Sequence, residues 1–168
     1  SVDEIKSGDL AFFLSCEKII KKDIRDKNKH NLVAHSSDLP QGKGWSPMAW
    51  QILEGKNEIT NTLFEAVDAV DAGEIYMQNK VYFDGHELLS ELHKKQGEKI
   101  NELVIEFVRL YPDIIGKKQT GKETFYAKRG QKDGELDANK SLAEQFDLLR
   151  VADNEKYTIM DPKHEFDL

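Results

Sequence analysis

Apolar runs and amphipathic stripes follow one another along the chain, and each predicts one structural element. Residues 9–15 and 31–35 are apolar runs bounded by polar residues, which is typical of strands buried on both faces of a sheet. Residues 58–67 and 74–83 are interpreted as two further strands, the first of which alternates and carries β-branched side chains. Residues 87–110 place their apolar side chains on one stripe, which predicts a long helix.

Proline and glycine mark the boundaries of shorter elements. Pro47 suits the first turn of a helix over residues 48–54, and Gly55 ends it. After Gly116 the sequence turns polar, and only a short strand and a short helix are expected there. We therefore expect an α/β fold, a mostly parallel sheet with flanking helices, followed by a C-terminal extension with a short helix.

Composition and charge exclude several classes of protein. The chain has 168 residues, and 24 basic against 31 acidic side chains give a net charge of −7, which argues against nucleic acid as the main ligand. No apolar run approaches the ~18 residues of a membrane span, so no membrane contact is expected. The single cysteine, Cys16, forbids an internal disulfide and suits the reducing cytoplasm, where we expect the protein to reside.

Candidate chemistry lies at the ends of two predicted strands. His35 follows one buried strand directly, and Asp71 precedes an Ala-Gly pair 36 residues later. In open α/β sheets, sites lie beyond the carboxyl ends of the strands. A histidine and an aspartate placed there can share a proton or stabilise an oxyanion. His86 and His93 share a helix face, but no cysteine or acidic set completes a ligand group, so no metal is expected.

The motifs around these two residues resemble a known family. His35-Ser36-Ser37-Asp38-Leu39-Pro40, Lys43-Gly44, Pro47 and Asp71-Ala72-Gly73-Glu74-Ile75 resemble the pattern of the folate-dependent formyltransferases. Residues 123–129 and 148–150 resemble the segment that follows the core in methionyl-tRNA and sugar formyltransferases. The resemblance implies that residues 1–115 form the C-terminal part of a formyltransferase-like Rossmann catalytic core and residues 116–168 an extension. The N-terminal Rossmann half of the family has no counterpart here.

The resemblance also implies a mechanism. The family moves a formyl group from N10-formyltetrahydrofolate to an amine, so His35 is expected to donate to the oxyanion and Asp71 to hold the imidazolium. The family's catalytic asparagine lies two residues before the histidine, where this chain has Val33. Asn31 points to the same strand face and could replace it if the strand end is bulged. The two serines after His35, or a residue outside this chain, are the other candidates.

Two further groups of residues are predicted to bind the substrates. The family binds folate near the first strand end and the loop before Asp71, which here gives Ser15, Lys18, Ile19, Val67 and Asp68. The predicted acceptor-binding residues are Ser37, Lys43, Trp45, Arg129 and Arg150. The two arginines could grip a phosphate through bidentate contacts, or form surface ion pairs with Asp133 or Asp137.

The acceptor is predicted from charge, length and one loop. Methionyl-tRNA formyltransferases are basic and carry a C-terminal barrel, for which this acidic chain has no room. The glycine-rich loop at residues 42–47 resembles formyltransferase-like proteins of surface-glycan pathways. We predict an N-formyltransferase for a nucleotide-linked amino sugar, with the two small-molecule substrates as partners and a homodimer as the candidate assembly. The alternatives are a non-catalytic folate-binding remnant or subunit, or a methionyl-tRNA formyltransferase.

Overall fold

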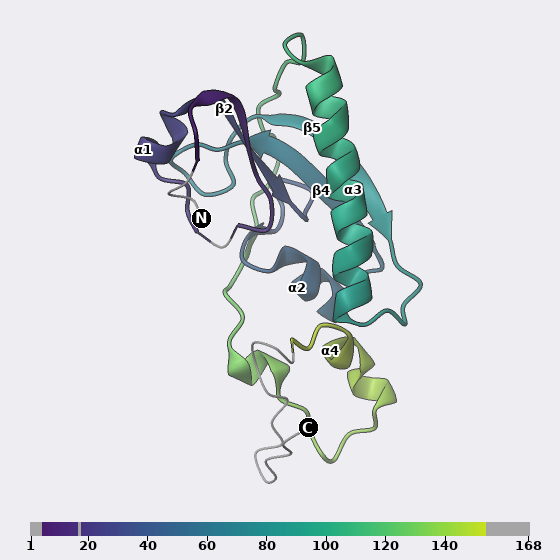
Figure 1. Cartoon of the computed structure of the whole chain (residues 1–168). Coiled ribbons are helices and arrows are strands. Elements are labelled where there is room, and N and C mark those ends of the chain that lie inside the picture. The colour runs from purple at the N-terminus through teal and green to yellow at the C-terminus, as the bar shows by residue number, and fades with distance from the viewer. Residues whose placement is uncertain (1–4, 17, 154–168) are drawn as a thin grey trace.

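The computed structural model describes residues 5–16 and 18–153, and within them a four-stranded sheet forms the centre of the fold (Figure 1). Its strands are β1 (Gly8–Phe13), β2 (Asn28–His35), β4 (Glu58–Glu65) and β5 (Ile75–Tyr82), in the order β1-β2-β4-β5. All four lie where the apolar pattern predicted strands. The α/β class with flanking helices is confirmed.

The direction of the strands corrects one part of the prediction. β1 and β2 are parallel, but β2 pairs with β4 and β4 with β5 in antiparallel fashion, so the sheet is mixed rather than mostly parallel. The connection from β2 to β4 contains the two-residue strand β3 (Lys43–Gly44) and the short helix α2 (Pro47–Leu53). The helix lies beside one end of the sheet, and β4 starts at the end where β2 stops (Figure 1). A buried strand is apolar in either direction, so its apolar pattern does not reveal which way it runs.

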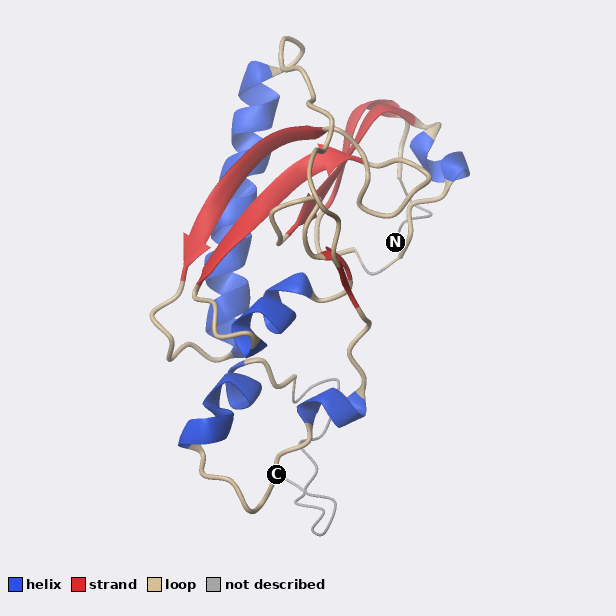
Figure 2. Ribbon diagram, turned by 180° about the vertical axis from the view of Figure 1, so that it is seen from behind, coloured by secondary structure: helices blue, strands red, loops and turns tan. Residues whose placement is uncertain are grey.

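Helices cover the sheet as the amphipathic stripes predicted. The long helix α3 (Leu89–Leu110) runs along one face of the sheet (Figures 1 and 2). Its side chains Leu103 and Phe107 pack with Leu32 of β2 and Leu63 of β4, all at most 3% exposed. The short helix α1 (Lys22–Arg25) joins β1 to β2 and buries Ile24. This apolar layer fixes the strand ends that carry the candidate site.

A second, two-stranded sheet joins the extension to the core. β3 (Lys43–Gly44) pairs in parallel with β6 (Phe125–Tyr126), so the segment after Gly116 runs beside the loop that follows His35. Beyond β6 lie single turns at Gln131–Gly134 and Ala143–Gln145 and the helix α4 (Phe146–Arg150). Residues 154–168 of the predicted extension lie outside the described residues.

Alanine substitutions at Gly73 and Gly97 are expected to change the free energy of unfolding in opposite directions. A Cβ at Gly73 would lie 1.7 Å from the Glu65 carbonyl oxygen, so Gly73→Ala should force β4 and the following loop apart and lower the free energy of unfolding by about 1–3 kcal/mol. A Cβ at Gly97, inside α3, meets nothing within 4 Å, so Gly97→Ala should raise that free energy by about 1 kcal/mol. Denaturant titration of both variants measures the difference, and equal shifts would contradict the packing described here.

Candidate active site

A pocket of about 640 Å³ opens beside the carboxyl ends of β1 and β2. The loop after β4 (residues 66–71) forms a second side of it, and the N-terminal half of α3 forms a third. The extension closes the pocket with residues 128–130 and 151–153. The pocket is large enough for a drug-sized or cofactor-sized molecule.

His35 and Asp71 meet in this pocket, as their spacing predicted. His35 ends β2 and is 8% exposed, and its Nε2 lies 2.8 Å from the carbonyl oxygen of Gly42. Because a carbonyl can only accept, Nε2 carries a hydrogen and donates it. The other ring nitrogen, Nδ1, faces the Asp71 Oδ2 at 3.8 Å, a gap longer than a direct hydrogen bond. The predicted proximity is confirmed.

The loop after His35 orients both members of this pair. The N–H of Gly44 donates to Asp71 Oδ2 at 2.8 Å, while the Gly42 carbonyl accepts from His35. Gly42 and Gly44 have φ values of 70° and 98°, a region that favours glycine. A Cβ at Gly44 would lie 2.4 Å from the Tyr126 carbonyl oxygen. The Gly-x-Gly sequence therefore permits both the turn and the close approach of β6.

The five residues predicted to bind folate all line the pocket. They are Ser15, Lys18, Ile19, Val67 and Asp68. Ile19 is 60% and Val67 41% exposed, so apolar side chains face open space at this end. Asp68 forms an ion pair with Arg25 of α1. The geometry offers an apolar surface on which a flat ring system can pack.

Of the residues predicted to bind the acceptor, the structure brings Trp45 and Arg129 to the pocket. Lys128 Nζ lies 5.3 Å from the centroid of the Trp45 ring. The Arg129 guanidinium donates to the carbonyl oxygens of Val151 at 3.1 Å and Asp133 at 3.2 Å, so it ties together parts of the extension. Aromatic and cationic groups thus gather at the side of the pocket built by the extension.

Three predicted acceptor residues and Asn31 lie elsewhere. Lys43 is 2% exposed, pairs with Glu123 at 2.6 Å and lines a separate hollow of about 380 Å³. Ser37 is 1% exposed and does not line the pocket. The Asn31 amide donates to the carbonyl oxygens of residues 25 and 28, turned toward α1, whereas Val33 does line the pocket. No strand bulge brings Asn31 to His35.

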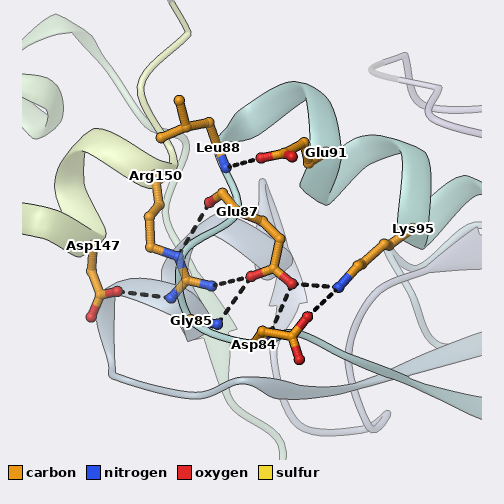
Figure 3. A network of polar contacts seen from close by, with 8 residues as sticks. All are labelled: Asp84, Gly85, Glu87, Leu88, Glu91, Lys95, Asp147 and Arg150. Carbon is orange, nitrogen blue, oxygen red and sulfur yellow. Dashed lines mark hydrogen bonds and ion pairs between the residues drawn. The ribbon is translucent and has the colours of Figure 1, made fainter.

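Arg150 also lies outside the predicted acceptor site, because it belongs to a buried polar network (Figure 3). It is 1% exposed, and its guanidinium contacts Glu87 at 3.5 Å and Asp147 at 2.8 Å. Lys95 of α3 completes the network with contacts to Glu87 at 2.5 Å and Asp84 at 2.8 Å. The alternative prediction for Arg150 was a surface ion pair with Asp133 or Asp137. Arg150 does form ion pairs, but its partners are Asp147 and the buried Glu87. Arg150 therefore anchors α4 against the start of α3.

Hydrogen bonds shift the pKa values of two members of this network. Burial raises the pKa of Glu87, but donation from Lys95 and from the backbone N–H groups of Asp84 and Gly85 outweighs it, so the pKa lies well below its usual value. Hydrogen bonds to Asp84 and Glu87 raise the pKa of Lys95 to about 12. Both groups are therefore charged at neutral pH.

Residues 5–16 and 18–153 contain no helix long and apolar enough to cross a membrane. In the same part of the chain, no cluster of three or more histidine, cysteine, aspartate or glutamate side chains is placed to hold a metal ion.

The sheet and its flanking helices make this an α/β protein, and the histidine–aspartate pair beside a strand end, facing the pocket, gives it a candidate acid–base site. The chain belongs to the formyl transferase family, because the sequence model of that family, described as "Formyl transferase", matches residues 3–108.

Relatives of this chain carry two kinds of name. A methionyl-tRNA formyltransferase of Clostridium beijerinckii (strain ATCC 51743 / NCIMB 8052) is 29% identical over 146 residues, covering 84% of this chain and 47% of that protein. A methionyl-tRNA formyltransferase from Clostridium thermocellum has a similar fold, with a TM-score of 0.73 at 22% identity, over 87% of this chain and 63% of that one. The chain thus spans about half the length of the curated relatives it matches.

A second solved structure is the formyltransferase PseJ from Anoxybacillus kamchatkensis, in complex with UDP-4,6-dideoxy-4-formamido-L-AltNAc and tetrahydrofolate. It is 27% identical with a TM-score of 0.61, over 71% of this chain and 64% of that chain.

Proposed function

We propose that this protein transfers a formyl group from N10-formyltetrahydrofolate to the amine of a nucleotide-linked amino sugar. The observation that carries the proposal is the 3.8 Å approach of His35 Nδ1 to Asp71 Oδ2 beside a pocket that all five expected folate-binding residues line. Residues 1–115 supply the catalytic part, and the extension supplies one wall of the pocket. The ligands named for PseJ, a formamido sugar nucleotide and tetrahydrofolate, support this pairing of donor and acceptor.

The two side chains divide the proton chemistry of formyl transfer between them. The amine attacks the formyl carbon, a new C–N bond forms, and the carbonyl oxygen becomes an oxyanion. The Gly42 carbonyl oxygen accepts from His35 Nε2, so the imidazolium form of His35, which carries a second hydrogen on Nδ1, donates to that oxyanion from Nδ1. Asp71 takes the proton that the amine loses and passes it to N10, as collapse of the intermediate breaks the bond between the formyl carbon and N10.

The position two residues before His35, where the family has its catalytic asparagine, is occupied here by Val33. Val33 lines the pocket without a hydrogen-bonding group, and Asn31 is turned away. Ser36 and Gln96 are polar side chains of the same pocket, linked by a hydrogen bond from the Gln96 amide to the Ser36 hydroxyl. Because the Ser36 hydroxyl already donates to Asn61 Oδ1 at 2.8 Å, we propose that the second hydrogen bond to the oxyanion comes from the remaining N–H of the Gln96 amide.

The acceptor side of the pocket suits a nucleotide. The Trp45 ring offers a stacking surface for a base, and the cationic groups of Lys128 and Arg129 lie on the same side for a phosphate. The second candidate function is methionyl-tRNA formylation, favoured by the names of the curated relatives. A folate-binding remnant is the third.

One labelling experiment separates these functions. The full chain is incubated with N10-formyltetrahydrofolate carrying an isotopic label in the formyl group, together with a panel of nucleotide-linked amino sugars or with methionyl-tRNA. The proposal expects label on an amino sugar. Label on methionyl-tRNA alone would establish the second function. Donor binding without any transfer would establish the remnant.

The Trp45 side chain provides a test of the acceptor site. Trp45→Leu should raise the acceptor KM about tenfold, because loss of base stacking costs about 1–3 kcal/mol, and should leave kcat nearly unchanged. Tyr82→Leu is the matched control, since Tyr82 lies on β5, is 61% exposed and does not line the pocket. Steady-state kinetics with varied acceptor measures both variants. An unchanged KM in Trp45→Leu would contradict the stacking role.

A further inference from the structure

Residues 117–126 cross both loops of the candidate site without lining its pocket. This crossing segment begins where Lys117 forms a backbone bridge to Ile75 of β5, and it ends in β6. Two of its side chains, Gln119 and Thr124, bond to backbone groups beside His35 and Asp71. They are far from those partners in sequence, so the contact is made only in the folded chain.

Gln119 holds the loop of Asp71. Its Nε2 donates to the carbonyl oxygen of Asp71 itself at 2.8 Å and to that of Gly73 at 2.9 Å. Asp71 has a φ of 50°, in the left-handed region that a non-glycine residue occupies at some cost. The two bonds from one amide bracket this residue and stabilise its conformation. Gln119 thereby fixes the backbone that carries the Asp71 carboxylate facing His35.

Thr124 holds the loop of His35 in the same manner. Its Oγ1 accepts from the Gly42 N–H at 2.7 Å, and its carbonyl oxygen accepts from the Lys43 N–H at 2.9 Å. The carbonyl of Gly42 is the acceptor for His35 Nε2. Thr124 thus fixes the residue that determines which ring nitrogen of His35 carries the hydrogen.

We propose that Gln119 and Thr124 are positioning residues that together set the distance between His35 Nδ1 and the Asp71 carboxylate and the tautomer of His35. The proposal rests on the proposed function for its catalytic consequence. A misplacement of about 1 Å can cost about 10²-fold in rate, so ties of this kind have a large effect on kcat without any contact to substrate.

Other contacts hold the extension to the core independently. Trp50 Nε1 donates to the Ala127 carbonyl at 2.8 Å, the Tyr126 hydroxyl donates to Glu54 at 2.9 Å, and Arg150 pairs with Glu87. Removal of one hydroxyl or one amide from the crossing segment therefore leaves the extension attached. Variants of Thr124 and Gln119 therefore test the positioning of His35 and Asp71 rather than the attachment of the extension.

The test of Thr124 is the tautomer of His35, read in the full chain from the imidazole nitrogen resonances, with His35→Ala to assign them. In the neutral form of the ring, wild type should show hydrogen on Nε2. Thr124→Val, which keeps the shape but loses the hydroxyl, should show a mixture of tautomers. Thr124→Ser, which keeps the Oγ acceptor, should restore the wild-type signature. An unchanged tautomer in Thr124→Val would overturn the role of Thr124.

The test of Gln119 is hydrogen exchange at the Gly44 amide, whose acceptor is Asp71 Oδ2. Gln119→Met should speed this exchange and lower kcat about ten- to a hundredfold, with the acceptor KM within twofold of wild type. Gln145→Met is the control, because the Gln145 amide donates to carbonyls of residues 137, 140 and 141 in the extension. It should leave exchange and kcat unchanged. Unaltered Gly44 exchange in Gln119→Met would overturn the role of Gln119.

The two resonance measurements need no turnover, so they judge the positioning separately from the proposed function. A changed His35 tautomer and Gly44 exchange in a chain that transfers no formyl group would support the positioning and refute the function. A normal rate in both variants with altered resonances would refute the catalytic consequence.

Discussion

Replacement of His35 by alanine is expected to lower kcat about 10²–10³-fold while the KM for donor and acceptor changes little. The oxyanion exists only after the amine has attacked, so a hydrogen bond from Nδ1 strengthens in the transition state and not in the ground state. Loss of one such donor costs about 3–4 kcal/mol of transition-state stabilisation. Gly42 leaves only Nδ1 for this role, because its carbonyl binds Nε2.

The matched control for this prediction is His86→Ala. His86 is exposed in the loop before α3 and does not line the pocket, so its removal should leave kcat and KM unchanged. Steady-state kinetics of the full chain with N10-formyltetrahydrofolate as donor compares the two variants. A change in KM alone for His35→Ala would mean that His35 binds substrate and does not stabilise the transition state.

Replacement of Glu87 by glutamine is expected to lower the free energy of unfolding at pH 7 by about 3–5 kcal/mol, the usual cost of removing one member of a buried ion pair. The Glu87 side chain is 3% exposed and the Arg150 side chain 1%, so the arginine charge would lose its buried partner (Figure 3). Because this pair anchors α4 to the start of α3, the extension should loosen first.

The same residue predicts a pH dependence. The folded-state pKa of Glu87 lies below its usual value of 4.5, so its stabilising contribution is present above pH 4.5 and is lost as the pH falls from there toward the folded-state pKa. The Glu87→Gln variant lacks this titrating group, so its stability should fall less over that acidic range.

Denaturant titrations of wild type and Glu87→Gln at neutral and acidic pH measure both effects. Glu106→Gln is the control, because Glu106 pairs with Arg109 at the surface of α3 and should not affect the denaturation midpoint at pH 7. Parallel losses of stability in wild type and Glu87→Gln on acidification would contradict the account of this network.

Local pattern was enough to predict the elements and the central pair. The apolar runs placed β1, β2, β4 and β5, and the motif around His35 and Asp71 predicted their meeting. The prediction of a mostly parallel sheet was wrong for β4 and β5. Residues 58–67 alternate and only Val81 of β5 is buried, a pattern that antiparallel strands often show, whereas the prediction followed the continuous apolar runs of β1 and β2.

Side-chain direction was the second limit. Lys43 and Arg150 are cationic residues near family motifs, and sequence alone cannot distinguish a cation that binds a phosphate from one that pairs with a buried carboxylate. Asn31 was chosen by strand periodicity, but its amide instead satisfies backbone carbonyls near α1. Thr124 lies in the segment 123–129 that resembles the family, but neither it nor Gln119 was predicted as a site residue, because their partners are backbone groups distant along the chain.

The most direct test of the candidate site is a crystal structure of the full chain with 5-formyltetrahydrofolate, a stable analogue of the donor. We expect the pterin to lie against the apolar side chains of Ile19 and Val67, with the formyl group within about 2.6–3.2 Å of His35 Nδ1 or Asp71, directly or through one water. A ligand bound outside this pocket, or one whose formyl group points away from both side chains, would contradict the assignment of the site.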